Sequence, residues 1–116
     1  MRLLAALLTV SASLHFTVWP QGPGGSSKSW TLNCTPARGT LPHPVRACTK
    51  LARLTDPFAP VPADVACSQI YGGPQTALVT GRFRGKAIRS RFNRHDSCQV
   101  ARWDRVRFLF PVSLAP

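Results

Sequence analysis

The chain of 116 residues contains no glutamate, and its acidic side chains are four aspartates, against fifteen lysines and arginines. Twelve of those fifteen are arginines, and they are concentrated in the last third of the sequence. So basic a surface attracts nucleic acid, anionic lipid and acidic polymers by electrostatics alone. The charge balance therefore predicts a surface that attracts polyanions. It does not indicate specific recognition of nucleic acid, and we expect no specific nucleic-acid partner.

The sequence also lacks the short motifs that carry catalysis. There is no G-x-S-x-G, no H-E-x-x-H and no glycine loop of the kind that holds phosphates. His95 and Asp96 are adjacent, but no serine or threonine stands out as a nucleophile beside them. These absences predict a protein that is not an enzyme and that needs no cofactor.

No apolar run is long enough to predict a membrane span, because the run from Leu3 to Val10 is soon followed by serine, threonine and histidine. One arginine precedes this run and small residues follow it, which is the layout of a secretory signal peptide. A membrane anchor and a buried N-terminal helix are the alternatives. We predict a signal peptide plus flexible lead-in over residues 1–25, cleaved near 13 or 24. One domain over residues 27–112 would follow, in a protein secreted to the extracellular space.

Cysteine is present in an even number, at Cys34, Cys48, Cys67 and Cys98. In a small exported chain this number favours two disulfides, for which three connectivities are open. A zinc site is the competing interpretation, but no C-x-x-C pair occurs and the spacings match no standard zinc template. We expect no metal. Two bridges that each contribute about 3–4 kcal/mol would offset the small core of so short a chain.

Hydrophobic patterning predicts an α+β domain with an antiparallel sheet. Residues 30–34 alternate like a half-buried strand, and residues 45–54 have the apolar spacing of a short helix. Residues 75–82 and 86–92 read as a hairpin that turns at Arg84-Gly85. A short helical turn is expected near residues 97–101, and residues 106–110 are predicted to form the last strand.

The stretch ADVACSQIYGGP, residues 63–74, has no regular pattern and follows a proline-rich connector. A bridge from Cys67 to a distant cysteine would clamp this loop, and the prolines on both flanks would stiffen it. Residues 68–71 would then be extended, exposed and held in place. An inhibitor that offers a substrate-like strand to a protease needs this arrangement, because a pre-ordered loop loses little conformational entropy on binding.

Further residues fall in register from about residue 29 to residue 110. They are Thr31-Leu32-Asn33-Cys34, Ala47-Cys48, Asp64-Val65-x-Cys67, Tyr71, Pro74, Gly81, Gly85-Lys86 and the aromatic stretch Val106–Phe110. With them the chain resembles the subtilisin inhibitor-like family of actinomycetes, small secreted inhibitors of serine proteases. The resemblance implies five antiparallel strands with two short helices, the disulfides Cys34–Cys48 and Cys67–Cys98, and a homodimer formed through the sheets.

The resemblance also implies a reactive site two residues after the third cysteine. Gln69 would be the P1 residue and Ile70 the P1′ residue, so that the scissile bond would be Gln69–Ile70. The other residues expected to contact the protease are Ala66 at P4, Cys67 at P3, Ser68 at P2 and Tyr71 at P2′. The implied partner is an extracellular serine protease of the subtilisin type.

The loop departs from the family pattern at several positions. Gln69 is neutral where the family has methionine, lysine or arginine, so a subtilisin-like pocket suits it better than a trypsin-like one. Ser68 replaces a common proline, and Gly72-Gly73 adds a residue and conformational freedom. Asp96 replaces an asparagine that supports the loop in the family. These changes predict a looser or redirected loop.

Two functions follow from the sequence. The first is a secreted inhibitor of subtilisin-like proteases that acts through the exposed reactive-site loop. The alternative is a cationic, disulfide-stapled secreted protein that binds anionic polymers or the cell envelope and keeps the fold with weak or no inhibition.

Overall fold

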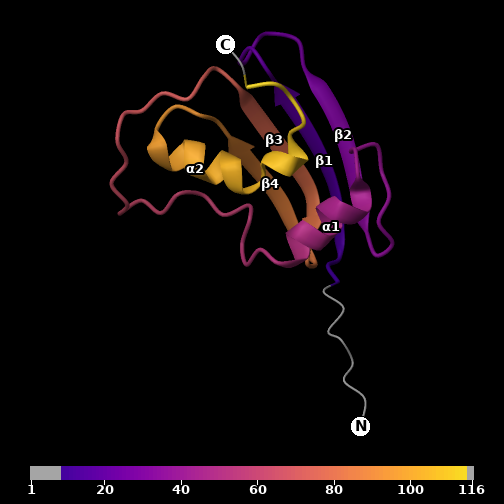
Figure 1. Cartoon of the computed structure of the whole chain (residues 1–116). Helices are drawn as coiled ribbons and strands as arrows, with labels where there is room; N and C mark the ends of the chain where they lie inside the picture. Colours follow the sequence, from indigo (N-terminus) through magenta and orange to yellow (C-terminus); the bar gives the residue numbers. More distant parts are fainter. Residues whose placement is uncertain (1–8, 115–116) are drawn as a thin grey trace.

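A four-stranded antiparallel sheet forms one layer of the structure and two α-helices cover one of its faces (Figure 1). This computed structural model describes residues 9–114. The strands are β1 (Ala12–Trp19), β2 (Lys28–Cys34), β3 (Thr76–Phe83) and β4 (Lys86–Phe92), in the order β2-β1-β3-β4. The helices are α1 (Pro44–Ala52) and α2 (Ser97–Arg105), followed by a short 3-10 helix, η1 (Arg107–Leu109). Neither α-helix among the described residues has the length and apolar character that crossing a membrane requires.

Strand β1 is a central strand, because it pairs with β2 on one side and with β3 on the other. Its sequence ASLHFTVW alternates apolar and polar residues, as a strand with one buried face does. Phe16 is fully buried opposite Trp30 and Val79, while its neighbour His15 is exposed on the other face.

This strand corrects the predicted domain boundary. Residues 12–19 lie within the segment assigned to a signal peptide and lead-in, so the domain starts well before residue 27. Cleavage near 24 would remove the strand that separates β2 from β3, and cleavage near 13 would remove its first residues. The apolar run that suggested export lies mostly in residues 1–8, outside the described residues, and a signal peptide there stays a prediction.

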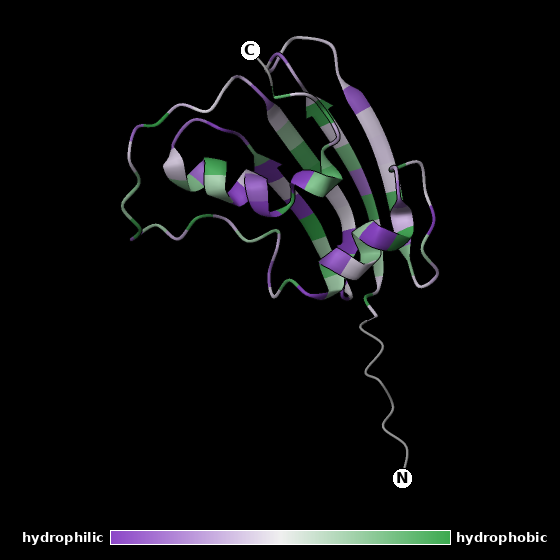
Figure 2. Cartoon of the chain, viewed as in Figure 1, coloured by the Kyte–Doolittle hydropathy of each residue, from purple (hydrophilic) through white to green (hydrophobic). Residues whose placement is uncertain are grey.

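The α+β fold with two helices and two disulfides is confirmed, but the sheet has four strands in the described chain rather than five. The predicted last strand, residues 106–110, is instead the 3-10 helix η1 with its two flanking residues, Val106 and Phe110. Alternating apolar residues suggested a strand, yet the fully buried positions are Val106, Leu109 and Phe110, which have helical spacing. Green segments of Figure 2 mark the apolar residues on the sheet and on the elements that cover it.

The core lies between the sheet and the helices and is centred on Phe110. The ring of Phe110 meets Phe16 of β1 at 6.4 Å, Phe92 of β4 at 5.2 Å and Trp103 of α2 at 4.8 Å between centroids. These edge-on and tilted contacts join α2 to both halves of the sheet. The Cys34–Cys48 disulfide joins α1 to the end of β2.

We predict that Phe16→Ala destabilises the protein by about 3–5 kcal/mol, because it removes a fully buried aromatic ring. His15→Ala is the matched control on the exposed face and should change stability by no more than about 0.5 kcal/mol. Urea unfolding of the two variants measures the difference. Equal stability of both variants would contradict the place of β1 in the core.

Candidate functional site

A long connector without helix or strand, residues 53–75, joins α1 to β3 and runs around α2 (Figure 1). Arg102 of α2 fixes its first half. The Arg102 guanidinium donates hydrogen bonds to the carbonyl oxygens of Ala59 (2.7 Å) and Phe58 (3.4 Å) and to Ser90 Oγ on β4 (2.6 Å). Ser90 Oγ also donates to the Phe58 carbonyl at 2.8 Å. The connector is thus attached to both the helix and the sheet.

Arg102 is half-buried, and its guanidinium carbon lies 3.9 Å from the centre of the Phe92 ring. Burial lowers the pKa of Arg102 below its ordinary value, since a buried site disfavours the charged form. An arginine nevertheless stays charged at any physiological pH. Its hydrogen bonds to carbonyl oxygens are therefore charge-assisted, which makes them stronger than bonds between neutral groups.

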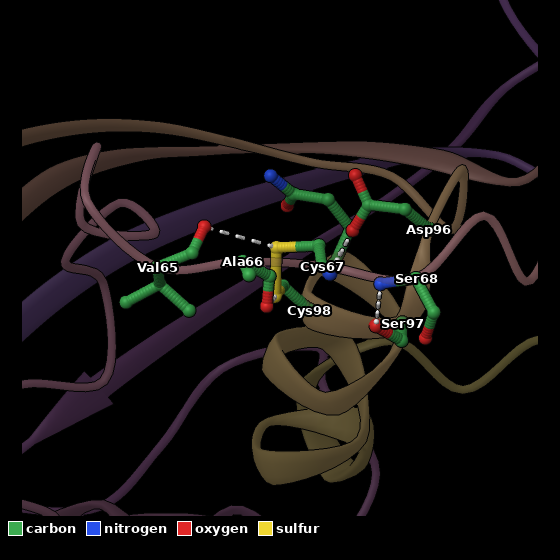
Figure 3. The surroundings of a disulfide bond; sticks show 8 residues. Val65, Ala66, Cys67, Ser68, Asp96, Ser97 and Cys98 are labelled. Carbon is green, nitrogen blue, oxygen red and sulfur yellow. Dashed lines mark hydrogen bonds between the residues drawn. A yellow bond between two sulfur atoms is a disulfide. The ribbon is translucent and has the colours of Figure 1, made fainter.

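The connector leads to residues 66–71, the loop in which the sequence predicts the reactive site, and the first half of this loop is fixed at the start of α2 (Figure 3). The disulfide Cys67–Cys98 joins the loop to the helix. Next to it, the Ser68 N–H donates to Ser97 Oγ at 2.9 Å, and the Ser97 N–H donates to the Ser68 carbonyl at 3.0 Å. One covalent bond and two hydrogen bonds thus fix the two residues before Gln69; we call this the first anchor.

A second anchor follows three residues after Gln69. The Gly72 N–H donates to the Arg94 carbonyl at 2.7 Å, and Arg94 Nε donates back to the Gly72 carbonyl at 3.3 Å. The Arg94 side chain is buried and forms an ion pair with Asp104 of α2 at 3.0 Å. The residues after Gln69 are therefore linked to α2 as well, through Arg94 and its ion pair with Asp104.

Gln69, Ile70 and Tyr71 lie between the two anchors and are exposed. Ile70 retains 62% of its accessible surface and Tyr71 retains 64%, which is unusual for large apolar side chains. The Tyr71 ring stacks on His95, with 6.1 Å between the ring centres. A short peptide with apolar side chains is thus presented to solvent while both of its ends are fixed.

Gly72 and Gly73 lie close to the body of the protein, where a side chain would not fit without a shift of its neighbours. A Cβ atom on Gly72 would lie 2.6 Å from Val100 Cγ2 and 3.2 Å from Arg94 Nε. Gly73 has a φ of 133°, and a Cβ atom there would lie 2.3 Å from Gln75 Oε1. The pair therefore permits a close approach that no larger residue allows.

Asp96 has a different role from the one expected of the family asparagine. Its carboxylate caps α2 by accepting a hydrogen bond from the Gln99 N–H at 2.9 Å. Loop support comes from the neighbouring Ser97 instead. Asp96 also lies within 4.8 Å of Cys67 and Cys98 sulfur atoms, but both cysteines are in the disulfide and offer no thiolate to a metal.

The structure brings together Cys67, Cys98 and the loop residues that the sequence predicts, and both predicted disulfides are present. Sequence reasoning missed Ser97, Arg94 and Arg102. The two arginines had been counted with the surface charge, and nothing in their local sequence distinguishes them from the exposed ones. Their roles depend on carbonyl oxygens that lie 22 and 43 residues away in the chain.

Comparison with known proteins identifies the family of the chain. The model of the subtilisin inhibitor-like family matches residues 9–95. The chain belongs to the subtilisin inhibitor-like family. Family membership places it among protease inhibitors rather than enzymes. The match includes β1, in agreement with the corrected domain boundary.

Among solved structures, the chain is similar to Streptomyces caespitosus sermetstatin, crystallised in complex with Bacillus licheniformis subtilisin. The TM-score is 0.51 and the sequence identity is 25%, over 89% of this chain and 99% of the sermetstatin chain. A comparison with curated protein sequences found no match. The structural likeness therefore covers almost the whole chain at low sequence identity.

We predict that Gly72→Ala destabilises the protein by about 1–3 kcal/mol, because the added methyl group overlaps Val100. Gly25→Ala is the control, since a Cβ atom there meets only ordinary contacts of 3.4 and 3.6 Å; its effect should stay below about 1 kcal/mol. Urea unfolding measures both. A Gly72→Ala variant as stable as the control would refute the close packing of the second anchor.

Proposed function

We propose that this chain inhibits subtilisin-like serine proteases by presenting the Gln69–Ile70 bond as a substrate-like peptide. The observation that carries the proposal is the pair of anchors, which fix residues 67–68 to the start of α2 and residue 72 to Arg94, and which leave Gln69, Ile70 and Tyr71 exposed. Because the loop is ordered before binding, little conformational entropy is lost when a protease binds it. The scaffold thereby favours tight binding.

The anchors also explain how such a loop resists turnover. If a protease cuts Gln69–Ile70, the new carboxyl end stays attached to Cys98 through Cys67, and the new amino end stays beside Arg94 through Gly72. The two ends are thus held close together at a high effective concentration, which favours resynthesis of the bond over release. Product release is slow for the same reason.

The loop chemistry supports a subtilisin-like target. Gln69 at P1 carries no charge and fits a broad pocket that does not require an ion pair. Ala66 at P4 and Ser68 at P2 are small and exposed, whereas Ile70 and Tyr71 offer apolar surface on the primed side. The similar structure of sermetstatin was solved in complex with a subtilisin, which agrees with a target of this class.

We also propose secretion, because the known targets of this kind of inhibitor are extracellular proteases. The homodimer stays a prediction. The sheet face away from the helices carries Arg82, Arg89 and Arg91, and no strand contains an acidic residue. Two copies that meet through this face would bring like charges together, so we expect any dimer to strengthen as salt screens them. A sedimentation mass that stays monomeric at high salt would refute the dimer.

Titration of a fixed amount of subtilisin with the purified protein tests the proposed function. We expect stoichiometric loss of activity at micromolar protein or below, with competitive kinetics against a peptide substrate. If the protease stays fully active while the loop is cut, the chain is not an inhibitor of this class. The alternative, a cationic binding protein with the inhibitor fold, predicts that second outcome.

Gln69→Lys is a sharper variant of the same test. The trypsin S1 pocket carries a carboxylate, so a lysine at P1 should strengthen trypsin inhibition by at least about thirtyfold through a buried charge pair. The control is Gln21→Lys, which adds the same charge at an exposed position outside the loop. Equal trypsin inhibition by the two variants would show that Gln69 is not the P1 residue.

A further inference from the structure

An open cleft of about 550 Å³ lies between the end of α1 and the junction of α2 with η1. Four cationic side chains line it: Lys50, Arg53, Arg105 and Arg107. Leu54 and Phe108 form the apolar part of its wall, and Lys50 Nζ lies 5.3 Å from the centre of the Phe108 ring. The cleft thus has more lysines and arginines in its lining than each of four other pockets of the described residues.

Lys50 and Arg105 lie in the last turns of α1 and α2, where a cation stabilises the helix end, but none of the four cations is in an ion pair among the described residues. Asp104 is the acidic residue in the wall of the cleft, and it is engaged by the buried Arg94. The carbonyl oxygens at the end of α1 are bound by Arg84, which donates to Leu51, Ala52 and Thr55. Arg53, Arg105 and Arg107 form no side-chain hydrogen bond or ion pair within the described chain. Their guanidinium groups are exposed and available to a ligand.

We propose that this cleft binds a multivalent phosphate anion. Three arginines suit phosphate because the planar guanidinium donates two parallel hydrogen bonds to its oxygens. The one carboxylate in the wall cannot neutralise four cations, whereas an anion with several phosphate groups carries enough negative charge to do so.

The cleft lies at the opposite end of α2 from the reactive-site loop. Ser97 and Cys98 begin the helix and hold the loop, whereas Arg105 ends it, about 12 Å away along the helix axis. Phosphate binding is therefore independent of the Gln69–Ile70 bond, and either property can fail without the other.

Calorimetric titration with inorganic tripolyphosphate at low salt tests the proposal on the full chain. We expect saturable binding of one tripolyphosphate per chain. The triple variant R53Q/R105Q/R107Q should bind at least about tenfold more weakly, since it loses three charge-assisted contacts. The matched control R38Q/R89Q/R91Q removes the same charge from exposed arginines outside the cleft and should lose no more than about threefold.

Equal losses in the two triple variants, binding of many anions per chain, or no binding by the unmodified protein would each overturn the site. Citrate, which carries similar charge on carboxylates, should bind more weakly at the same ionic strength; equal or tighter citrate binding would overturn the assignment to phosphate. The single variants R107Q and R91Q repeat the comparison if a triple variant does not fold. Both triple variants should inhibit subtilisin as the unmodified protein does.

Discussion

The Cys67–Cys98 disulfide is the link on which the proposed site depends, because it joins an exposed loop to a helix that is itself attached to the core through the buried Trp103. From Cys98 the helix α2 continues to Trp103, which is fully buried against Phe110, and Phe110 contacts the rings of β1 and β4. The loop is therefore attached, through one helix, to the most densely packed part of the protein. A loop that is fixed in this way costs little entropy to bind.

Hydrogen bonds from buried and half-buried arginines complete this attachment. Arg102 fixes the connector before the loop, and Arg94 fixes the segment after it. Both lie beside aromatic rings, Phe92 and Trp103, respectively. The same residue type thus has two functions in this chain: some arginines support the backbone of the connector and loop, and others remain exposed at the cleft and on the open sheet face.

Much of the fold could be predicted from local patterns, because β2, the β3–β4 hairpin and α1 have clear apolar periodicity and clear turns. The resemblance supplied the disulfide pairing that the spacing of the cysteines left open. Strand β1 was missed because its alternating residues directly follow an apolar run that also suits an export signal, and periodicity cannot separate the two. The stretch 106–110 was wrongly predicted to be a strand. Apolar residues at its alternate positions 106, 108 and 110 are compatible with both a strand and a tight helix.

The part of the site that a disulfide defines could be predicted from the sequence. The parts that tertiary contacts define could not. Cys67 identified the loop, since a bridged cysteine fixes its neighbours. The sequence shows the conformational freedom of Gly72-Gly73 but not their close approach to Val100 and Gln75, which only the structure reveals. Asp96 and Ser97 are adjacent, and only the structure distinguishes the residue that caps the helix from the one that binds the loop.

Mass spectrometry of the protein after long incubation with subtilisin tests the central claim most directly. We expect one cut, at Gln69–Ile70. The unreduced product should gain the mass of one water and stay in one piece, because Cys67–Cys98 joins the two fragments. Reduction should then release fragments that end at Gln69 and begin at Ile70. A first cut at another bond, or digestion to many small peptides, would contradict the account.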